Sequence, residues 1–253
     1  MDYFVVFWWA MIAAAAVVFV TLFFVDAGYG KFTSPKWGYA IPNKAAWVIM
    51  EAPVAVLLLF FWAFSDRKTM LTPLIFFVFM QIHYIHRAFI FPFLLRGKSK
   101  MPLGIMFMGF FFNIANAFMQ GYWIFYYSPQ DLYGNSWLQT PQFIIGAMLF
   151  FTGLIINIDS DRRIRNLRKS GDSKHYLPRG GMYNYVTSAN YFGEFIEWTG
   201  FAVAAWSMPG LVFAIWTFAN LVPRANAIYK NYNQTFTEEM QGKKLKRIFP
   251  FVY

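Results

Sequence analysis

The chain has 253 residues, of which 58% are hydrophobic and 13% are charged, and its mean hydropathy is +0.39. These values exclude an ordinary soluble domain of this length, which needs far more polar surface. The sequence has no cysteine, which excludes disulfides and thiolate chemistry, and its three histidines leave little room for a metal site. The net charge of +10 comes from basic residues between apolar segments, which favours loops facing anionic lipid over a nucleic-acid surface.

Seven apolar segments follow one another, and most approach the roughly 20 residues needed to span hydrocarbon. They cover residues 3–25, 45–64, 71–95, 103–127, 141–158, 184–206 and 208–223, of which the fifth and the last are short. No basic residue precedes the first segment, so we expect a retained helix and not a cleaved signal. Pro209 and Gly210 predict a tight hairpin between the last two segments, although a six-helix count remains open.

The charges in the loops predict how the helices are oriented. With the N-terminus outside, the inner segments 26–44, 96–102, 159–182 and 224–253 hold 3, 3, 7 and 6 Lys/Arg, a total of 19. The outer loops hold only Arg67 and Lys68, and Arg87 lies within a span. This bias predicts an all-α, seven-helix integral membrane protein, one domain over residues 1–253, with its C-terminus in the cytoplasm.

Ionisable residues inside membrane spans are costly and are therefore candidates for function. Glu51 lies two residues before Pro53 in the second span, and it either takes part in chemistry or snorkels to the surface. The third span carries His83-Tyr84-Ile85-His86-Arg87. The uncharged Tyr84 phenol can donate a hydrogen bond to a carbonyl oxygen or to a neighbouring helix. Because the two histidines lack a third ligand at suitable spacing, we expect no metal.

Polar residues recur at helical spacing in two further spans. Asn113, Asn116 and Gln120 form one stripe in the fourth span, which suits helix packing and cavity lining equally. In the sixth span the spacing i, i+4, i+7 places an amide and two carboxylates on one face, in Asn190, Glu194 and Glu197. This second face indicates a polar ligand or an ion-pair network.

The end of the fifth span predicts a surface for a nucleotide. If the helix continues, Asn157, Asp161, Arg165 and Arg168 share one face. Guanidinium groups suit phosphates and a carboxylate can accept ribose hydroxyls, although basic juxtamembrane stretches are also common lipid anchors. No dinucleotide-binding glycine motif or Walker loop is present, so helix faces and loops would have to hold a nucleotide.

Short motifs along nearly the whole chain resemble, in their order, those of the steroid 5α-reductase family, and they suggest a bacterial homologue. They are Gly28-Tyr29-Gly30-Lys31, Ala45-Ala46-Trp47, Glu51-Ala52-Pro53, residues 83–87, Gln120-Gly121-Tyr122, residues 157–161, Leu167-Arg168-Lys169, Ser188-Ala189-Asn190, Gly193-Glu194, Ile196-Glu197-Trp198 and Pro250-Phe251. The steroid-reducing branch is the most similar. Polyprenol reductases and trans-2-enoyl-CoA reductases resemble the chain less.

The resemblance implies an NADPH-dependent 3-oxo-5-alpha-steroid 4-dehydrogenase, which reduces the 4,5 double bond of a 3-oxo-Δ4-steroid. Glu51 and Tyr84 match the family's pair near the 3-keto oxygen. Donors at that oxygen would stabilise the developing enolate, and Glu51 either donates when protonated or orients Tyr84. The residues expected to bind the cofactor, from the resemblance and the helix faces, are Tyr29, Arg87, Gln120, Asn157, Asp161, Arg165, Arg168, Asn190, Glu194, Glu197, Arg224 and Tyr232.

The chain departs from the family pattern at three places. Met50 stands where a glutamine usually precedes the glutamate, His175-Tyr176 replaces a common Tyr-Arg pair, and Ile228 replaces a frequent histidine. These changes affect a polar contact near the substrate or nicotinamide and the way in which the loops grip the cofactor.

Other functions remain open from the sequence. They are an NADPH-dependent polyprenol or trans-2-enoyl-CoA reductase, a membrane methyltransferase using S-adenosylmethionine, and a non-catalytic sterol-binding protein. For the reductase we expect a monomer in a bacterial inner membrane, or in the endoplasmic reticulum of a eukaryote. The steroid would enter from the bilayer and NADPH from the basic cytoplasmic side.

Overall fold

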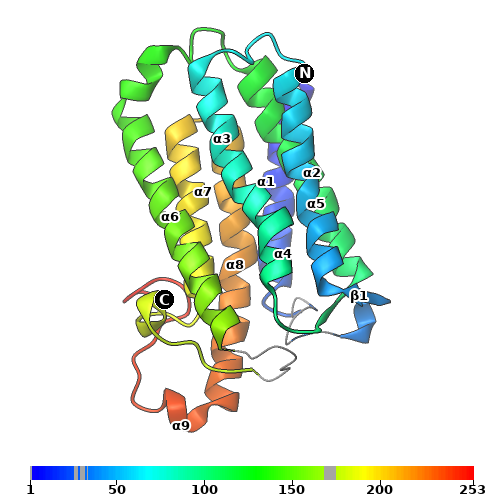
Figure 1. Ribbon diagram of the computed structural model, residues 1–253, viewed down its shortest axis with the longest axis vertical. Helices are drawn as coiled ribbons and strands as arrows, with labels where there is room; N and C mark the ends of the chain where they lie inside the picture. The colour runs from blue at the N-terminus through cyan, green and yellow to red at the C-terminus, as the bar shows by residue number, and fades with distance from the viewer. Residues whose placement is uncertain (1, 26–27, 29–31, 33, 168–174) are drawn as a thin grey trace.

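The computed structural model describes residues 2–25, 28, 32, 34–167 and 175–253, and these form a bundle of long helices lying side by side (Figure 1). The N-terminus lies at one end of the bundle. The C-terminus lies toward the other end, where the short helix α9 (Thr237–Met240) is also found. Figure 1 also shows that successive long helices run in alternating directions.

The long helices are α1 (Tyr3–Thr21), α2 (Asn43–Ala63), α3 (Leu71–Ile85), α5 (Leu103–Tyr122), α6 (Pro141–Asn166), α7 (Ala189–Ala205) and α8 (Met208–Thr235). Among the described residues, six helical stretches are long and apolar enough to cross a membrane, and α7, with 17 residues, is too short to be counted with them. The chain is thus an all-α polytopic membrane protein with about six candidate membrane-spanning helices.

Several predicted helix boundaries were wrong. The fifth predicted segment continues past residue 158 to Asn166 and the last continues past residue 223 to Thr235, so neither helix is short. Polar residues end an apolar run but many are good helix formers, which is why the helices continue beyond it. The first helix ends at Thr21, four residues early, and the sixth starts at Ala189 because a 3₁₀ turn occupies residues 181–184.

The predicted hairpin between the last two helices is confirmed. Trp206 ends α7 in a left-handed conformation with φ of 45°, and the Ser207 hydroxyl accepts a hydrogen bond of 3.1 Å from the Gly210 amide. Pro209 stands in the first turn of α8, where its missing N–H costs nothing. The two segments are therefore separate helices, and they do not merge into one.

Two helices widen into π-helical turns at their ends. His86–Ile90 links α3 to α4 (Phe91–Leu94), and Trp123–Tyr127 follows α5. Short 3₁₀ helices occupy Pro35–Trp37, Asn135–Gln139 and Gly181–Asn184. A two-stranded antiparallel sheet of β1 (Ala40–Pro42) and β2 (Lys100–Pro102) joins the starts of α2 and α5. Functional sites often carry π-helical turns, which makes His86–Ile90 a segment of interest.

Glycines bring α6 and α7 into backbone contact. A Cβ atom added at Gly153 would lie 2.2 Å from the Glu197 nitrogen, and one added at Gly193 would lie 2.4 Å from the Asn157 nitrogen. Small residues of this kind let membrane helices approach closely. The close approach places Asn157 of α6 beside the polar face of α7.

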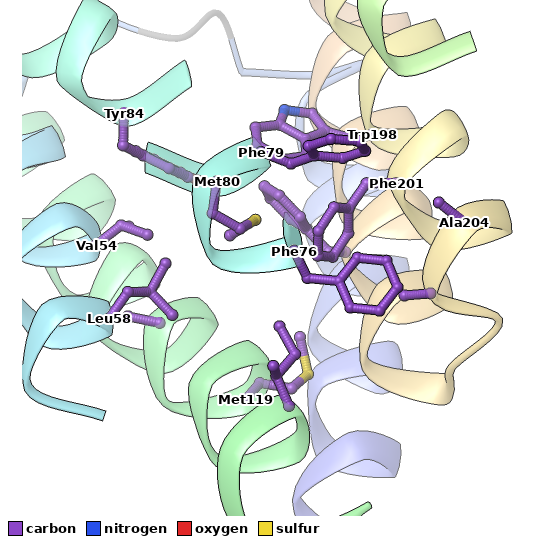
Figure 2. Packing of buried hydrophobic residues seen from close by; sticks show 14 of the residues in the cluster. Val54, Leu58, Phe76, Phe79, Met80, Tyr84, Met119, Trp198, Phe201 and Ala204 are labelled. Atoms are coloured by element: carbon purple, nitrogen blue, oxygen red, sulfur yellow. The ribbon is translucent and has the colours of Figure 1, made fainter. Parts of the chain in front are cut away.

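The apolar core is built largely from aromatic side chains between α3, α6, α7 and α8. Figure 2 shows Phe76, Phe79, Trp198 and Phe201 among its buried residues, with Tyr84 at the edge of the group. The Phe79 and Phe150 rings stack at 4.6 Å between centroids. Contacts of this kind hold α3 against α6 and α7, the helices that carry many of the polar residues described next.

Candidate active site

Most of the polar residues expected to be functional lie in one half of the bundle. Asn113, Asn116 and Gln120 are the exception, because they lie in the second half of α5, where Gln120 bonds the Pro209 carbonyl of the α7–α8 hairpin. The others occupy the first halves of α2 and α7 and the second halves of the α3–α4 stretch, α6 and α8. Because the helices alternate in direction, these halves coincide at the end that also carries α9.

Asn113 of α5 donates hydrogen bonds to two neighbouring residues of α2, Met50 and Glu51. Its Nδ2 donates to the Met50 carbonyl oxygen at 2.7 Å and to Glu51 Oε2 at 3.1 Å. Glu51 is only partly buried. The side chain of Met50 lies against α5, because a Cβ at Gly109 would be 2.4 Å from its sulfur. Met50, where the resemblance implied a polar contact in relatives, is therefore used here for apolar packing.

The hydroxyl of Tyr84 also points at α5, about one turn beyond Asn113. Its side chain is 3% exposed, and Asn116 Nδ2 donates to the hydroxyl oxygen at 3.2 Å. The ring packs against Trp198, with 5.7 Å between centroids. Glu51 and Tyr84 are thus held by two amides, three residues apart on α5.

Arg87, in the π-helical turn, joins α3 to the faces of α6 and α7. Its guanidinium donates to Asp161 Oδ2 at 2.9 Å and to Glu194 Oε2 at 3.4 Å. Asn190 Nδ2 donates to the other Asp161 oxygen at 3.1 Å, and Asn157 Nδ2 donates to the Asn190 carbonyl at 2.9 Å. Each carboxylate oxygen has two acceptor sites, so Asp161 can still accept hydrogen bonds from a ligand.

His83 and Glu197 form a separate buried pair. His83 Nδ1 lies 2.8 Å from Glu197 Oε1, and Glu197 is fully buried. The His83 ring packs against Tyr84 and Trp198, and among the described residues the pair shares no hydrogen bond with the Arg87 network. Among the residues that the structure describes, no group of three or more His, Asp or Glu could hold a metal ion.

Comparison with known proteins places this arrangement in a family. The profile of a family described as 3-oxo-5-alpha-steroid 4-dehydrogenase matches residues 99–253. The chain is 38% identical over 243 residues to human 3-oxo-5-alpha-steroid 4-dehydrogenase 1, covering 95% of this chain and 92% of the relative. It belongs to the steroid 5-alpha-reductase family.

Further relatives come from cattle and from plants. Identity is 36% over 244 residues to 3-oxo-5-alpha-steroid 4-dehydrogenase 1 of Bos taurus, which covers 95% of this chain and 93% of the relative. It is 38% over 249 residues to steroid 5-alpha-reductase DET2 of Arabidopsis thaliana, with 96% and 94% covered. The profile begins after Tyr84, but these relatives extend the similarity over α2 and α3, which carry Glu51 and Tyr84.

The remaining residues of the expected cofactor set lie along α6 and α8. Arg165 is partly buried one turn beyond Asp161, and Tyr232 is partly buried near the end of α8. Arg224 donates to the Tyr191 hydroxyl at 2.8 Å and lies over its ring. Tyr29 and Arg168 lie outside the described residues.

Three residues of this steroid 5-alpha-reductase family site have a place that the sequence patterns did not give them. Asn113 and Asn116 were visible as a stripe, but their contacts with Glu51 and Tyr84 depend on how α5 packs against α2 and α3. Tyr183 gave no sequence signal. Burial, with a smaller contribution from the nearby Asp161 carboxylate, raises the pKa of the Tyr183 phenol well above its ordinary value.

Proposed function

We propose that this chain reduces the 4,5 double bond of a 3-oxo-Δ4-steroid with NADPH as the hydride source. The observation that carries the proposal is a buried phenol, Tyr84, held by an amide of α5 that lies three residues from the amide bonded to Glu51, in a chain of this family. The names of the relatives support it, because they describe reduction of the same bond in cattle, human and plant proteins.

The residues of the site fit an NADPH molecule. A nicotinamide carboxamide and ribose hydroxyls bring N–H and O–H donors, and two buried oxygens at the site, Gln120 Oε1 and Glu197 Oε2, have no hydrogen-bond partner among the described residues. Asn157, Asn190 and Asp161 would hold the ribose side. Since Arg87 already neutralises two carboxylates, phosphate charge would fall to other basic residues, such as Arg165.

The chemistry of the protein side chains follows from where charge develops. NADPH, when bound, supplies the hydride that adds to C5. Electrons of the 4,5 double bond then move toward the C3 oxygen, and the Tyr84 hydroxyl donates to that oxygen as its negative charge grows. Glu51 accepts a hydrogen bond from Asn113, and when it is protonated its hydroxyl can donate to the same ketone oxygen. Water supplies the proton that C4 finally takes up.

We further propose that α7 is a seventh span, with the N-terminus outside and the C-terminus in the cytoplasm of a bacterial cell. The support is the number of basic residues at the two ends of the bundle. The loop between α2 and α3 has only Arg67 and Lys68 as basic residues, whereas the segments at the other end hold most of the lysines and arginines. The native chain has no cysteine, so single cysteines can be labelled from either side. Lys244→Cys should react only from the cytoplasmic side and Lys68→Cys only from outside. The reverse pattern would overturn this orientation.

Binding of NADPH tests the proposed function directly. Because a ligand that binds only the folded state stabilises it, about 100 Kd of NADPH should add about 2.7 kcal/mol to the free energy of unfolding of the detergent-solubilised protein. S-adenosylmethionine should give no protection. Protection by S-adenosylmethionine alone would favour a methyltransferase, and no protection by NADPH would contradict a reductase.

A further inference from the structure

Tyr84 stands at the end of a chain of side-chain hydrogen bonds along α5. Gln120 Nε2 donates to the Pro209 carbonyl at 2.8 Å and to Asn116 Oδ1 at 3.3 Å. Asn116 Nδ2 in turn donates to the Tyr84 hydroxyl oxygen at 3.2 Å. Asn116 is 0% exposed and Gln120 is 1% exposed, so water does not compete for these bonds.

The direction of this chain is fixed at one end by the protein backbone. A carbonyl oxygen can only accept, so the amide nitrogen of Gln120 must face Pro209. The same nitrogen then requires the oxygen of Asn116, which leaves the nitrogen of Asn116 to face Tyr84. If Asn116 were turned over, two donors would meet at Gln120, and the Tyr84 proton would be drawn to Asn116.

We propose that Asn116 and Gln120 are positioning residues that keep the Tyr84 proton free for the carbonyl oxygen of the ligand. Their anchor is the hairpin between α7 and α8, through the Pro209 carbonyl. The proposal rests on the proposed function, because it assigns a task to residues around the same phenol. It also gives the stripe on α5 a role beyond helix packing.

Two physical effects make the arrangement useful for catalysis. A hydroxyl whose oxygen already accepts a hydrogen bond becomes a better donor, since bonds in a chain polarise one another. The orientation is also set before the reaction begins, so no reorganisation is needed as charge develops on the ketone. Gln120 Oε1 takes no part in the chain and stays available to a ligand.

Substitution of Asn116 tests the proposal through kcat. Asn116→Leu keeps the approximate shape and removes both polar groups, and it should lower kcat roughly three- to tenfold with little change in KM. Asn116→Asp should lower kcat by about 100-fold at alkaline pH, because the Tyr84 hydroxyl would then donate its hydrogen bond to the new carboxylate and not to the ligand. Its kcat should recover as the pH falls, because the protonated acid can again donate.

A second amide on the neighbouring helix provides the matched control. Gln81 of α3 donates to the Ala55 carbonyl at 2.9 Å, outside the Tyr84 chain. Gln81→Leu should lower thermal stability about as much as Asn116→Leu and leave kcat unchanged. If both variants lower kcat equally, the loss comes from helix packing and the proposal is wrong.

A double variant separates this proposal from the proposed function. If Asn116 acts through Tyr84, adding Asn116→Leu to Tyr84→Phe should cause no further loss of kcat. A full multiplicative loss would overturn the positioning role. If Tyr84→Phe lowers kcat and Asn116→Leu does not, only the positioning role fails. If Tyr84→Phe itself has wild-type kcat, the assigned chemistry fails and this proposal fails with it.

Discussion

Asp161 and Asp159 are two carboxylates of one helix with different surroundings and different roles. Asp161 is buried and accepts from Arg87 and Asn190, at the meeting point of three helices. Asp159 is more exposed and pairs with Arg162 at 2.7 Å and Arg163 at 2.6 Å, all within α6. Exposed pairs of this kind contribute little to stability, whereas the buried carboxylate has unused acceptor sites beside the α7 face.

Substitution at these two positions should therefore have different effects on cofactor binding. Asp161→Asn removes a charged acceptor and should weaken NADPH binding roughly tenfold or more, since hydrogen bonds to charged groups are worth about 1.5–3 kcal/mol. Asp159→Asn should leave NADPH affinity within about twofold of wild type. Thermal protection titrated with NADPH measures both variants, and equal affinities would contradict the placement of the cofactor at Asp161.

At the scale of the helices, the site depends on the contact between α6 and α7. The glycines that allow this contact are spaced seven residues apart on each helix, at Gly146 and Gly153 and at Gly193 and Gly200. They bring Asn157 and Asp161 of one helix beside Asn190 and Glu194 of the other. A side chain in place of one of these glycines would push apart the two faces that we assign to the cofactor.

Gly153→Ala should therefore damage both stability and binding. Its Cβ would meet the backbone nitrogen of Glu197, which cannot move aside as a flexible side chain could. We expect a loss of about 1–3 kcal/mol or more in the free energy of unfolding, together with weaker NADPH binding. Gly134→Ala is the control, since the atoms nearest to its added Cβ lie at 3.9 Å, an ordinary contact distance. Equal thermal midpoints for the two variants would show that the helices can separate at no cost.

The sequence predicted the helices better than their contacts. Apolar length located all seven segments, and Pro209 and Gly210 marked the hairpin, because these signals are local. The apolar runs stop before the ends of α6 and α8, since polar residues continue a helix after hydrocarbon ends, and for α6 the shared face of Asn157, Asp161 and Arg165 had indicated this continuation. The bonds from Asn113 and Asn116 to Glu51 and Tyr84 were beyond prediction, because helical spacing gives a face but not its neighbour.

At the scale of the whole molecule, most of the polar residues of the candidate site and most of the basic residues lie toward the same end of an otherwise apolar bundle. An apolar substrate can approach such a site through the bilayer, and a charged cofactor can approach it from water. Tyr84 is buried, packed against Trp198 (Figure 2) and bonded to Asn116. In the function that we propose, this phenol is where the two reactants meet.

The most direct test is NADPH-dependent reduction of a 3-oxo-Δ4-steroid in detergent micelles by wild type and by Tyr84→Phe, with thermal stability measured alongside. Wild type should form the saturated 3-oxo product. Tyr84→Phe should keep its fold and its NADPH protection, while kcat falls about 10²–10³-fold, the scale of a lost oxyanion donor. Wild-type turnover by a folded Tyr84→Phe variant, or no reduction by the wild-type protein, would contradict the account.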